Sequence, residues 1–222
     1  MRAADHLLAG EIGDAARDLE HAVVAAGREE GDGKRAAFVL GQIQVVESTV
    51  DHAVHAEPLP LHDQRLVQAD AEPGNWMSHG RTYSEQRYSP LAQVNAQSVG
   101  KLGLAWFYDL KTERGIEATS LVVDGVMYTT SAWSIVHAID ARTGTALWTF
   151  DPKVAKDKAR HACCDAVNRG VALWQGQVFV GALDGRLIAL DAATGKELGK
   201  VDAGCPLGTG PALFGQQLFV GG

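Results

Sequence analysis

The sequence contains no apolar run of about 18 residues or more, so it does not predict a membrane-spanning helix. It has only three cysteines in 222 residues, which excludes a disulfide-rich scaffold. No Cys-x-x-Cys-His string for haem attachment is present. Residues 1–20 mix acidic side chains into their apolar positions and lack the continuous apolar core of a secretory signal. In the chain as written we therefore expect neither a membrane span nor an export signal.

Basic residues are scarce in the first third of the chain. Residues 1–70 carry 6 Lys and Arg against 13 Asp and Glu, a balance of −7, whereas residues 71–222 carry 14 of each kind. All five tryptophans and 19 of the 25 glycines lie in the second part. Neither part has the basic excess that general nucleic-acid binding requires. The chain is expected to consist of two unlike parts, and nucleic acid is not an expected partner.

The acidic first part gives only weak structural signals. Residues 1–27 place leucine, isoleucine and valine at roughly helical spacing before Gly27, which predicts a short helix. Residues 36–54 do not decide between helix and strand. We expect residues 1–69 to be an N-terminal extension of doubtful origin, helical or disordered. A misplaced start codon, a frame error or a rearranged gene remnant would explain it.

From about residue 115 the pattern changes to short apolar, β-branched runs separated by turn residues. Asp-Gly, Gln-Gly and Thr-Gly pairs stand between the runs, and such pairs suit tight hairpin turns. The sequence therefore predicts an all-β meander, with strands inside 120–130, 134–144, 145–150, 170–182, 185–195, 196–201 and 212–222.

The meander repeats. Residues 122–150 align with residues 173–201 at an offset of 51, so that Asp140 matches Asp191 and Gly144 matches Gly195. A further copy begins at about residue 213. Four short strands at a period of this size are typical of β-propeller blades, which bury their faces by stacking on neighbours. We expect a partial propeller of two and a fraction blades, within residues 70–222.

Each copy contains the string AxDxxTG, followed in the first copy by a tryptophan. The aspartate and threonine oxygens can accept hydrogen bonds from the turn, and glycine can take a positive φ. Trp148 completes the first copy, and we expect it to pack one blade against its neighbour. Gly199 stands at the corresponding place in the second copy. We also assign Trp106, Trp133 and Trp174 to packing between blades.

Cys163 and Cys164 are adjacent in the stretch HACCDAVNRG, and three interpretations compete for them. With His161 they could bind zinc, although the cysteines of zinc sites are usually separated by two to four residues. They could be buried reduced thiols that pack as small apolar groups. They could also form a vicinal disulfide, whose strain usually accompanies a functional site.

The blade repeats, the strand GIEATSLVVDGVMY and the stretch HACCDAVNRGVA together resemble the pyrroloquinoline quinone (PQQ)-dependent alcohol dehydrogenases. These are periplasmic quinoproteins and quinohaemoproteins with an eight-bladed propeller. The resemblance begins near Asp70, where DAEPGNWMSHGRTYSEQRYSPLAQVN is similar to the start of that family, and continues to Gly222. It would cover roughly the first quarter to third of a family member, so we expect the chain to be incomplete and inactive by itself.

The resemblance implies a cofactor site. In the family, a vicinal disulfide matching Cys163 and Cys164 lies against one face of the quinone. Arg169 matches an arginine that binds the cofactor, and its planar fork suits a carboxylate. Glu117 matches a glutamate at the edge of the cofactor, and Thr209 falls where the family has a cofactor-contacting threonine. Without the resemblance, Arg169 would be expected to pair with Asp165, and Glu117 to be an exposed strand residue.

The resemblance also implies a reaction. Calcium, or a lanthanide in one subfamily, activates the quinone while an aspartate acts as base, and hydride passes from a primary alcohol to the quinone. Cytochrome c then accepts the electrons. The metal ligands and the catalytic aspartate of the family fall after Gly222, so no metal ligand or catalytic residue is assigned here. The sequence does not distinguish a haem c-containing member of the family from a haem-free one, because the haem-attachment motif is absent from it.

Two alternatives are kept. One is a non-catalytic propeller scaffold similar to the outer-membrane assembly lipoproteins, which share the blade repeat but lack the cysteine pair. The other is a membrane-bound PQQ glucose dehydrogenase, which the cysteines and the lack of membrane spans disfavour. Cys205 has no role that the resemblance assigns.

Overall fold

The structure, a computed structural model, consists almost entirely of strands. It describes residues 61, 63–162, 164–207, 209–214 and 217–221, together with the backbone of residues 7–8, 21–29 and 36–45. Within these ranges, fourteen strands form four sheets whose paired strands are antiparallel. Apart from one short α-helix, α1 (Asp63–Val67), the remaining helical segments are 3-10 turns.

Two of the sheets are four-stranded units in which each strand pairs with the next along the chain. The first contains β5 (Leu121–Val123), β6 (Val126–Thr130), β7 (Val136–Asp140) and β8 (Ala146–Phe150). The second contains β9 (Val171–Trp174), β10 (Gln177–Gly181), β11 (Arg186–Asp191) and β12 (Glu197–Asp202). A two-stranded sheet follows, formed by β13 (Ala212–Phe214) and β14 (Gln217–Phe219). The expected two and a fraction blades are confirmed.

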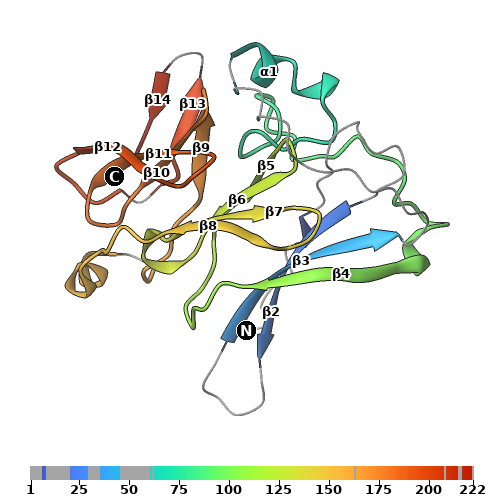
Figure 1. Cartoon of the computed structure of the whole chain (residues 1–222), viewed down its shortest axis with the longest axis horizontal. Helices are drawn as coiled ribbons and strands as arrows, with labels where there is room; N and C mark the ends of the chain where they lie inside the picture. The colour runs from blue at the N-terminus through green and yellow to red at the C-terminus, as the bar shows by residue number, and fades with distance from the viewer. Residues whose placement is uncertain are drawn as a thin grey trace.

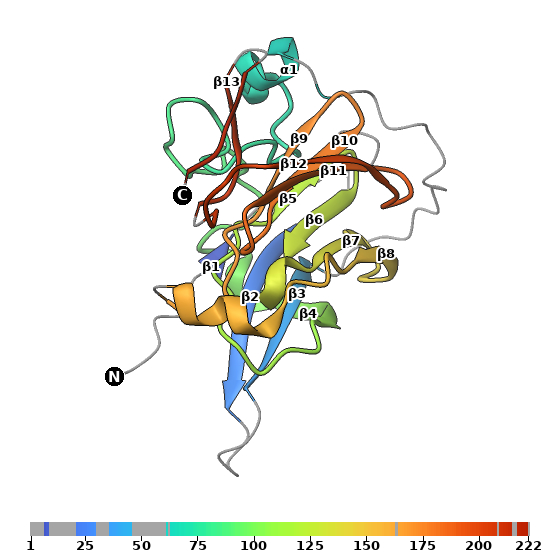
Figure 2. The same ribbon diagram turned by 90° about the vertical axis from the view of Figure 1, so that its left-hand side faces the viewer.

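A further sheet brings the N-terminal segment against the propeller part. Its order is β1-β2-β3-β4, from β1 (Leu7–Leu8), β2 (His21–Glu29), β3 (Ala36–Val45) and β4 (Leu102–Asp109). Both views place this sheet beside β5–β8, which in turn lies next to β9–β12 (Figures 1 and 2). Residues 7–8 and 21–27 are strand, so the helix expected over residues 1–27 is wrong at these positions, and the rest of that range lies outside the described residues. The undecided segment 36–54 is strand over its first ten residues.

The hairpin turns follow from the residues that the sequence places in them. Asp124 and Gly125 link β5 to β6 with φ values of 50° and 81°, and Gln175 and Gly176 link β9 to β10 in the same way. Positive φ at both central residues matches the twist of antiparallel strands. Between these turns the strands carry the core: every residue of β6 is buried, and Val136, Ala138 and Ile139 of β7 are fully buried.

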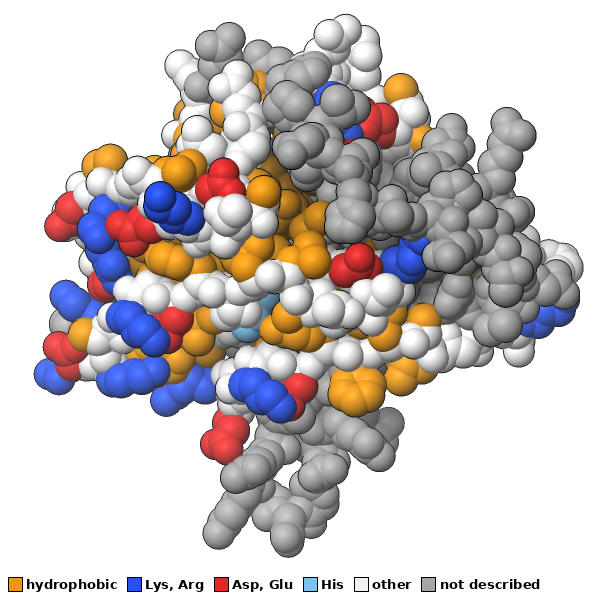
Figure 3. Space-filling view, in the orientation of Figure 1, with side chains coloured by type: hydrophobic (Ala, Val, Ile, Leu, Met, Phe, Trp, Pro, Cys, Tyr) orange, Lys and Arg blue, Asp and Glu red, His pale blue; other side chains and the backbone are white. Residues whose placement is uncertain are grey.

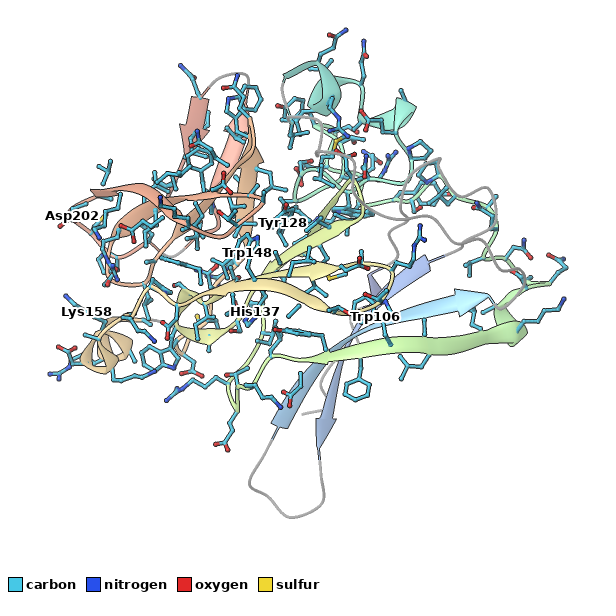
Figure 4. The ribbon with its side chains drawn as sticks, viewed as in Figure 1. Trp106, Tyr128, His137, Trp148, Lys158 and Asp202 are labelled. Atoms are coloured by element: carbon cyan, nitrogen blue, oxygen red, sulfur yellow. The ribbon has the colours of Figure 1, made fainter. Side chains whose placement is uncertain are left out.

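Successive sheets are joined by tryptophans on their outer strands. Trp106 of β4 donates its indole N–H to the Ala141 carbonyl at 3.1 Å, and Trp148 of β8 donates to the Ala192 carbonyl at 2.9 Å. Each indole lies so close to a turn glycine that a Cβ at Gly144 or Gly195 would come within 2.6 Å of ring atoms. Figure 4 shows the two indoles on successive sheets. The predicted role of Trp106 and Trp148 in packing between blades is confirmed.

The segment before the first blade is attached by a charged cluster. Arg65 of α1 is 8 % exposed and donates to Glu72 at 2.5 Å and to Asp124, in the β5–β6 turn, at 2.7 Å. Asn75 donates to both carboxylates and accepts from the Asp124 backbone N–H. Leu61 and Leu66 are buried in the same region. Residues just before position 70 therefore pack against the first blade.

A buried histidine lies inside the first blade. His137 of β7 is 5 % exposed, and its imidazole contacts the Ser131 hydroxyl at 3.0 Å and the Tyr108 hydroxyl at 3.4 Å. Its ring also meets the ring of Tyr108 edge to face, and it lies between β4 and β8 in Figure 4. Burial disfavours the imidazolium form and lowers the pKa of His137 to about 4.

We expect this histidine to make the protein less stable in mild acid. Its pKa is lower in the folded chain than the ordinary 6.5, so the unfolded chain binds more protons between these values. Stability contributed by neutral His137 is complete above about pH 6.5 and is lost as the pH falls towards 4, by about 2 kcal/mol between pH 7 and pH 5. Urea unfolding at both pH values measures the loss. In His137→Gln, which cannot be protonated, this part of the pH dependence should disappear; an unchanged slope would contradict the assignment.

Candidate functional site

A cavity of about 320 Å³ lies at the inner strands of the blades. One wall comes from β5, β9 and β13, the first strands of three successive sheets, and another from residues 77–85. This volume is in the range of small-molecule sites. Its polar lining groups include Ser78, His79, Thr119, Arg169 and Thr209, and its apolar lining groups include Leu66, Met77, Leu121, Val171, Leu173 and Leu213.

Arg169 brings the cationic group to this cavity. It stands just before β9, and its guanidinium lies 3.0 Å from the carboxylate of Glu117. The following residue, Gly170, has φ +114°, and a Cβ there would lie 2.9 Å from the Thr119 carbonyl. Any other residue at position 170 would therefore separate the Arg169 segment from β5. The alternative pairing of Arg169 with Asp165 is wrong.

Asp165 is instead bound by another arginine. Arg114 forms an ion pair with Asp165, and both side chains are partly exposed. Glu117 is also exposed, at 41 %, but it lies in the segment before β5 and not in a strand. Because Glu117 and Arg169 both remain accessible to water, their mutual attraction is weak, and a ligand carboxylate can approach the same guanidinium.

Thr209 lies on the same cavity, after the second blade. Its hydroxyl accepts a hydrogen bond from the Gly221 backbone N–H at 2.9 Å, so part of its hydrogen-bonding capacity is already used. The next residue, Gly210, is packed so closely on Arg169 that a Cβ there would lie 3.1 Å from the Arg169 carbonyl oxygen. The structure thus brings together Glu117, Arg169 and Thr209, which are separated by up to 92 positions in the sequence.

The two adjacent cysteines occupy the loop between the 3-10 turn η4 (Lys156–His161) and β9. Cys163 lies outside the described residues, so the disulfide with Cys164 stays a prediction. Cys164 is exposed and immediately precedes Asp165, which has φ +76°. The ion pair of Asp165 with Arg114 holds this loop against the segment that carries Glu117.

The remaining polar groups of the cavity are hydroxyls, the imidazole of His79 and the carboxylate of Glu85. The Ser78 hydroxyl oxygen is buried and has no hydrogen-bond partner within the described part of the chain, although it lines the cavity. His79 accepts a hydrogen bond from the Arg87 guanidinium at 2.5 Å. Burial, reinforced by the charge of Arg87, lowers the pKa of His79, so this imidazole is neutral at pH 7. Arg169 is then the cation that faces the cavity from its β9 wall.

Sequence reasoning did not identify the wall formed by residues 77–85. Ser78 and His79 belong to the segment that resembles the family start, but nothing in their spacing indicates a cavity. Thr119 was also missed, although it lies two positions after Glu117 and is therefore expected on the same side of an extended chain. An unpaired buried hydroxyl such as Ser78 is visible only when the packing is known.

Beside the cysteine loop, Trp133 carries two cations on its ring. The Lys156 ammonium lies 3.8 Å and the Arg114 guanidinium carbon 5.2 Å from the ring centroid. Trp133 is partly buried against the hydrophobic core, and these two charges lie over its ring; its assignment to packing between blades stays a prediction. Lys and Arg side chains gather on this edge of the molecule, around η4 (Figure 3). The basic edge contains Lys153, Lys156, Lys158 and Arg160, all of them exposed.

The described residues include neither a cluster of metal-ligand side chains nor a membrane-spanning helix. None of these residues form a group of three or more His, Cys, Asp or Glu side chains that could hold a metal ion. No helix in the described ranges is long and apolar enough to cross a bilayer.

The fold described so far is a partial propeller with an arginine at a cavity on its inner strands. The family model described as the PQQ "Glucose/ethanol/alcohol dehydrogenase, beta-propeller domain" matches residues 76–201. The matched range is more than half of the chain, so the chain belongs to this family.

Known relatives are similar over most of the described chain. The quinohemoprotein alcohol dehydrogenase ADH-IIG of Pseudomonas putida is 59% identical over 145 residues, which are 65% of this chain and 20% of that protein. Its solved structure matches with a TM-score of 0.69 at 53% identity, covering 71% of this chain and 24% of that one. The 1-butanol dehydrogenase (cytochrome c) of Thauera butanivorans is 58% identical over 56% of this chain and 18% of its own length.

A structure of a europium-containing methanol dehydrogenase matches with a TM-score of 0.67 at 36% identity, over 71% of this chain and 29% of that one. The chain spans about a fifth of the length of the curated relatives that it matches.

Proposed function

We propose that this chain supplies one side of the quinone pocket of a PQQ-dependent alcohol dehydrogenase. The observation that carries the proposal is that Arg169 and Thr209 line the cavity, with Glu117 paired to Arg169 beside it, in a chain that belongs to the family. The named relatives are dehydrogenases of alcohols, which supports a small primary alcohol as substrate. The proposed cofactor set is PQQ with Ca²⁺ or a lanthanide, and the europium of the methanol dehydrogenase supports the metal.

The chemistry of the cavity is consistent with this cofactor. When bound, PQQ supplies an electron-accepting quinone that takes a hydride from the alcohol. Arg169 would bind one of its carboxylates through charge-assisted hydrogen bonds. The hydroxyls of Ser78 and Thr119 would pair with its remaining oxygens, while Leu121 and Val171 would exclude water from the flat ring.

The electron acceptor that we propose is a cytochrome c. The support is that the Thauera relative is a 1-butanol dehydrogenase (cytochrome c), and that other relatives are quinohemoproteins, a name that indicates haem. The vicinal disulfide of Cys163 and Cys164 is part of the same proposal, as a rigid support for one face of the quinone. A periplasmic location is proposed from the family resemblance.

Replacing Arg169 by alanine tests the proposal. PQQ is titrated into the chain while the fluorescence of its five tryptophans is followed. Because the chain supplies only one side of the pocket, we expect the parent chain to bind PQQ weakly, and Arg169→Ala to bind it at least about tenfold more weakly still, because one charge-assisted pair is lost. Arg186→Ala is the matched control. It removes the same charge, but Arg186 is paired with Asp184 and does not line the cavity. Equal affinity in all three proteins, or no binding by the parent, would contradict the proposal.

A further inference from the structure

The residue before Arg169 is buried, and its side chain makes three hydrogen bonds. Asn168 is 8 % exposed, and its side-chain amide donates to the Gly181 carbonyl at 2.8 Å and to the Ser134 hydroxyl at 3.1 Å. Its side-chain oxygen accepts from the Gly170 backbone N–H at 3.0 Å. The amide of Asn168 therefore fixes the chain on both sides of Arg169.

Ser134 is the second member of this arrangement. It is fully buried, has φ +59°, and ends the 3-10 turn η3 (Ala132–Ser134) between β6 and β7. Its hydroxyl oxygen accepts hydrogen bonds from Asn168 and, at 3.2 Å, from the Leu183 backbone N–H. One hydroxyl thus joins the first blade, the loop before β9 and the end of β10.

Packing limits Arg169 on its remaining sides. A side chain at Gly170 would clash with the Thr119 backbone, and one at Gly210 would crowd the Arg169 carbonyl. The Arg169 backbone therefore lies between two close backbone contacts and the Asn168 hydrogen bonds. The Arg169 backbone is thereby fixed, and its guanidinium forms the ion pair with Glu117.

We propose that Ser134 and Asn168 are positioning residues that aim the Arg169 guanidinium at the ligand carboxylate. A planar guanidinium binds a carboxylate through two parallel hydrogen bonds only when its orientation is fixed. A residue that holds the backbone in place removes part of the ordering cost of binding. Neither residue touches the cavity, so they act through Arg169. For PQQ as the ligand, this inference rests on the proposed function.

Three variants separate positioning from general stability. Ser134→Ala removes the hydroxyl that accepts from Asn168. Asn168→Asp keeps the acceptor for Gly170 but loses both donors. Ser131→Ala is the matched control, because Ser131 is also a fully buried serine, three positions away, and its hydroxyl contacts His137 instead. Urea unfolding checks that each variant folds.

The first readout needs no ligand. The Nε–H signal of Arg169, assigned by its loss in Arg169→Lys, reports the order of the guanidinium through ¹⁵N relaxation. We expect an ordered Arg169 signal in the parent and in Ser131→Ala, and a clearly lower order parameter in Ser134→Ala and Asn168→Asp. Similar order in all four proteins would overturn the inference, as would an equal loss of order in Ser131→Ala.

The second readout is PQQ titration of the same proteins. We expect about tenfold weaker binding in Ser134→Ala and Asn168→Asp, and parental affinity in Ser131→Ala. Parental affinity in Ser134→Ala and Asn168→Asp would also overturn the inference. Should the parent fail to bind PQQ, the proposed function fails, and the order of Arg169 alone decides whether Ser134 and Asn168 position it.

Discussion

Replacement of Arg65 by alanine is expected to destabilise the protein by about 3–5 kcal/mol, because it leaves two carboxylates without their shared cation in a partly buried cluster. Arg65 binds both Glu72 and Asp124, and its strong hydrogen bonds to them raise the pKa of the guanidinium further above its ordinary value. The substitution leaves these acids side by side, with Asn75 able to donate to both but not to neutralise either. Equilibrium unfolding in urea at pH 7 measures the effect.

Two further variants define the cause. Arg65→Lys keeps the charge but cannot bind both acids through a fork, so it should recover only part of the loss. Lys111→Ala removes an ion pair with Asp109 whose lysine is 82% exposed, and it should change stability by less than about 0.5 kcal/mol. An Arg65→Ala chain as stable as Lys111→Ala would show that the cluster does not attach the segment to the first blade.

Replacement of Trp148 by alanine should lower the free energy of unfolding by about 3 kcal/mol, since a large side chain leaves a packed interface. The indole donates to the Ala192 carbonyl, packs on Gly195, and lies 6.0 Å from the ring of Tyr128. The Tyr128 hydroxyl donates to the same carbonyl, at 3.3 Å, and cannot fill the space of the indole. Circular dichroism during urea unfolding is the measurement, because tryptophan fluorescence itself changes.

Leu147 provides the control on the same strand. It precedes Trp148 and is 50 % exposed, so Leu147→Ala should cost well under the loss seen for Trp148→Ala. A similar loss in both variants would mean that strand β8 is weakened generally and that the indole is not the contact that joins the sheets.

The blades were predictable because local signals agree with one another. Alternating apolar runs, hairpin turns at Asp124-Gly125 and Gln175-Gly176, and an internal repeat all indicate the same strands. Strand β4 was not predicted. It buries Trp106 yet exposes Leu104 and Phe107, so its pattern does not show a clean apolar face.

The error in residues 1–27 has a similar origin. Val23 and Val24 fit helical spacing, but they are β-branched residues that also suit a strand, and β2 pairs with β3 over nine positions. The strand conformation of β2 depends on its pairing with β3, which in turn pairs with β4 much later in the chain. A local sequence pattern does not contain that information.

The candidate site was predictable only through family resemblance. Arg169, Glu117 and Thr209 do meet at one cavity or beside it. The contact between Ser134 and Asn168 joins positions 34 residues apart and has no signature in composition or spacing. Hydrogen bonds of this kind appear only when the blades are placed side by side.

The indole contacts between sheets all run in one direction. In each contact, a tryptophan on the outer strand of one sheet donates to a carbonyl in a turn of the following sheet. Each of these sheets is therefore attached through its outer strand to the sheet that comes next along the chain. At Gly199, which aligns with Trp148, β12 has no indole to make such a contact, and no atom lies within 4 Å of the place where a Cβ would stand. If the chain were pulled mechanically, we therefore expect the contact between β12 and the sheet that follows it to separate first.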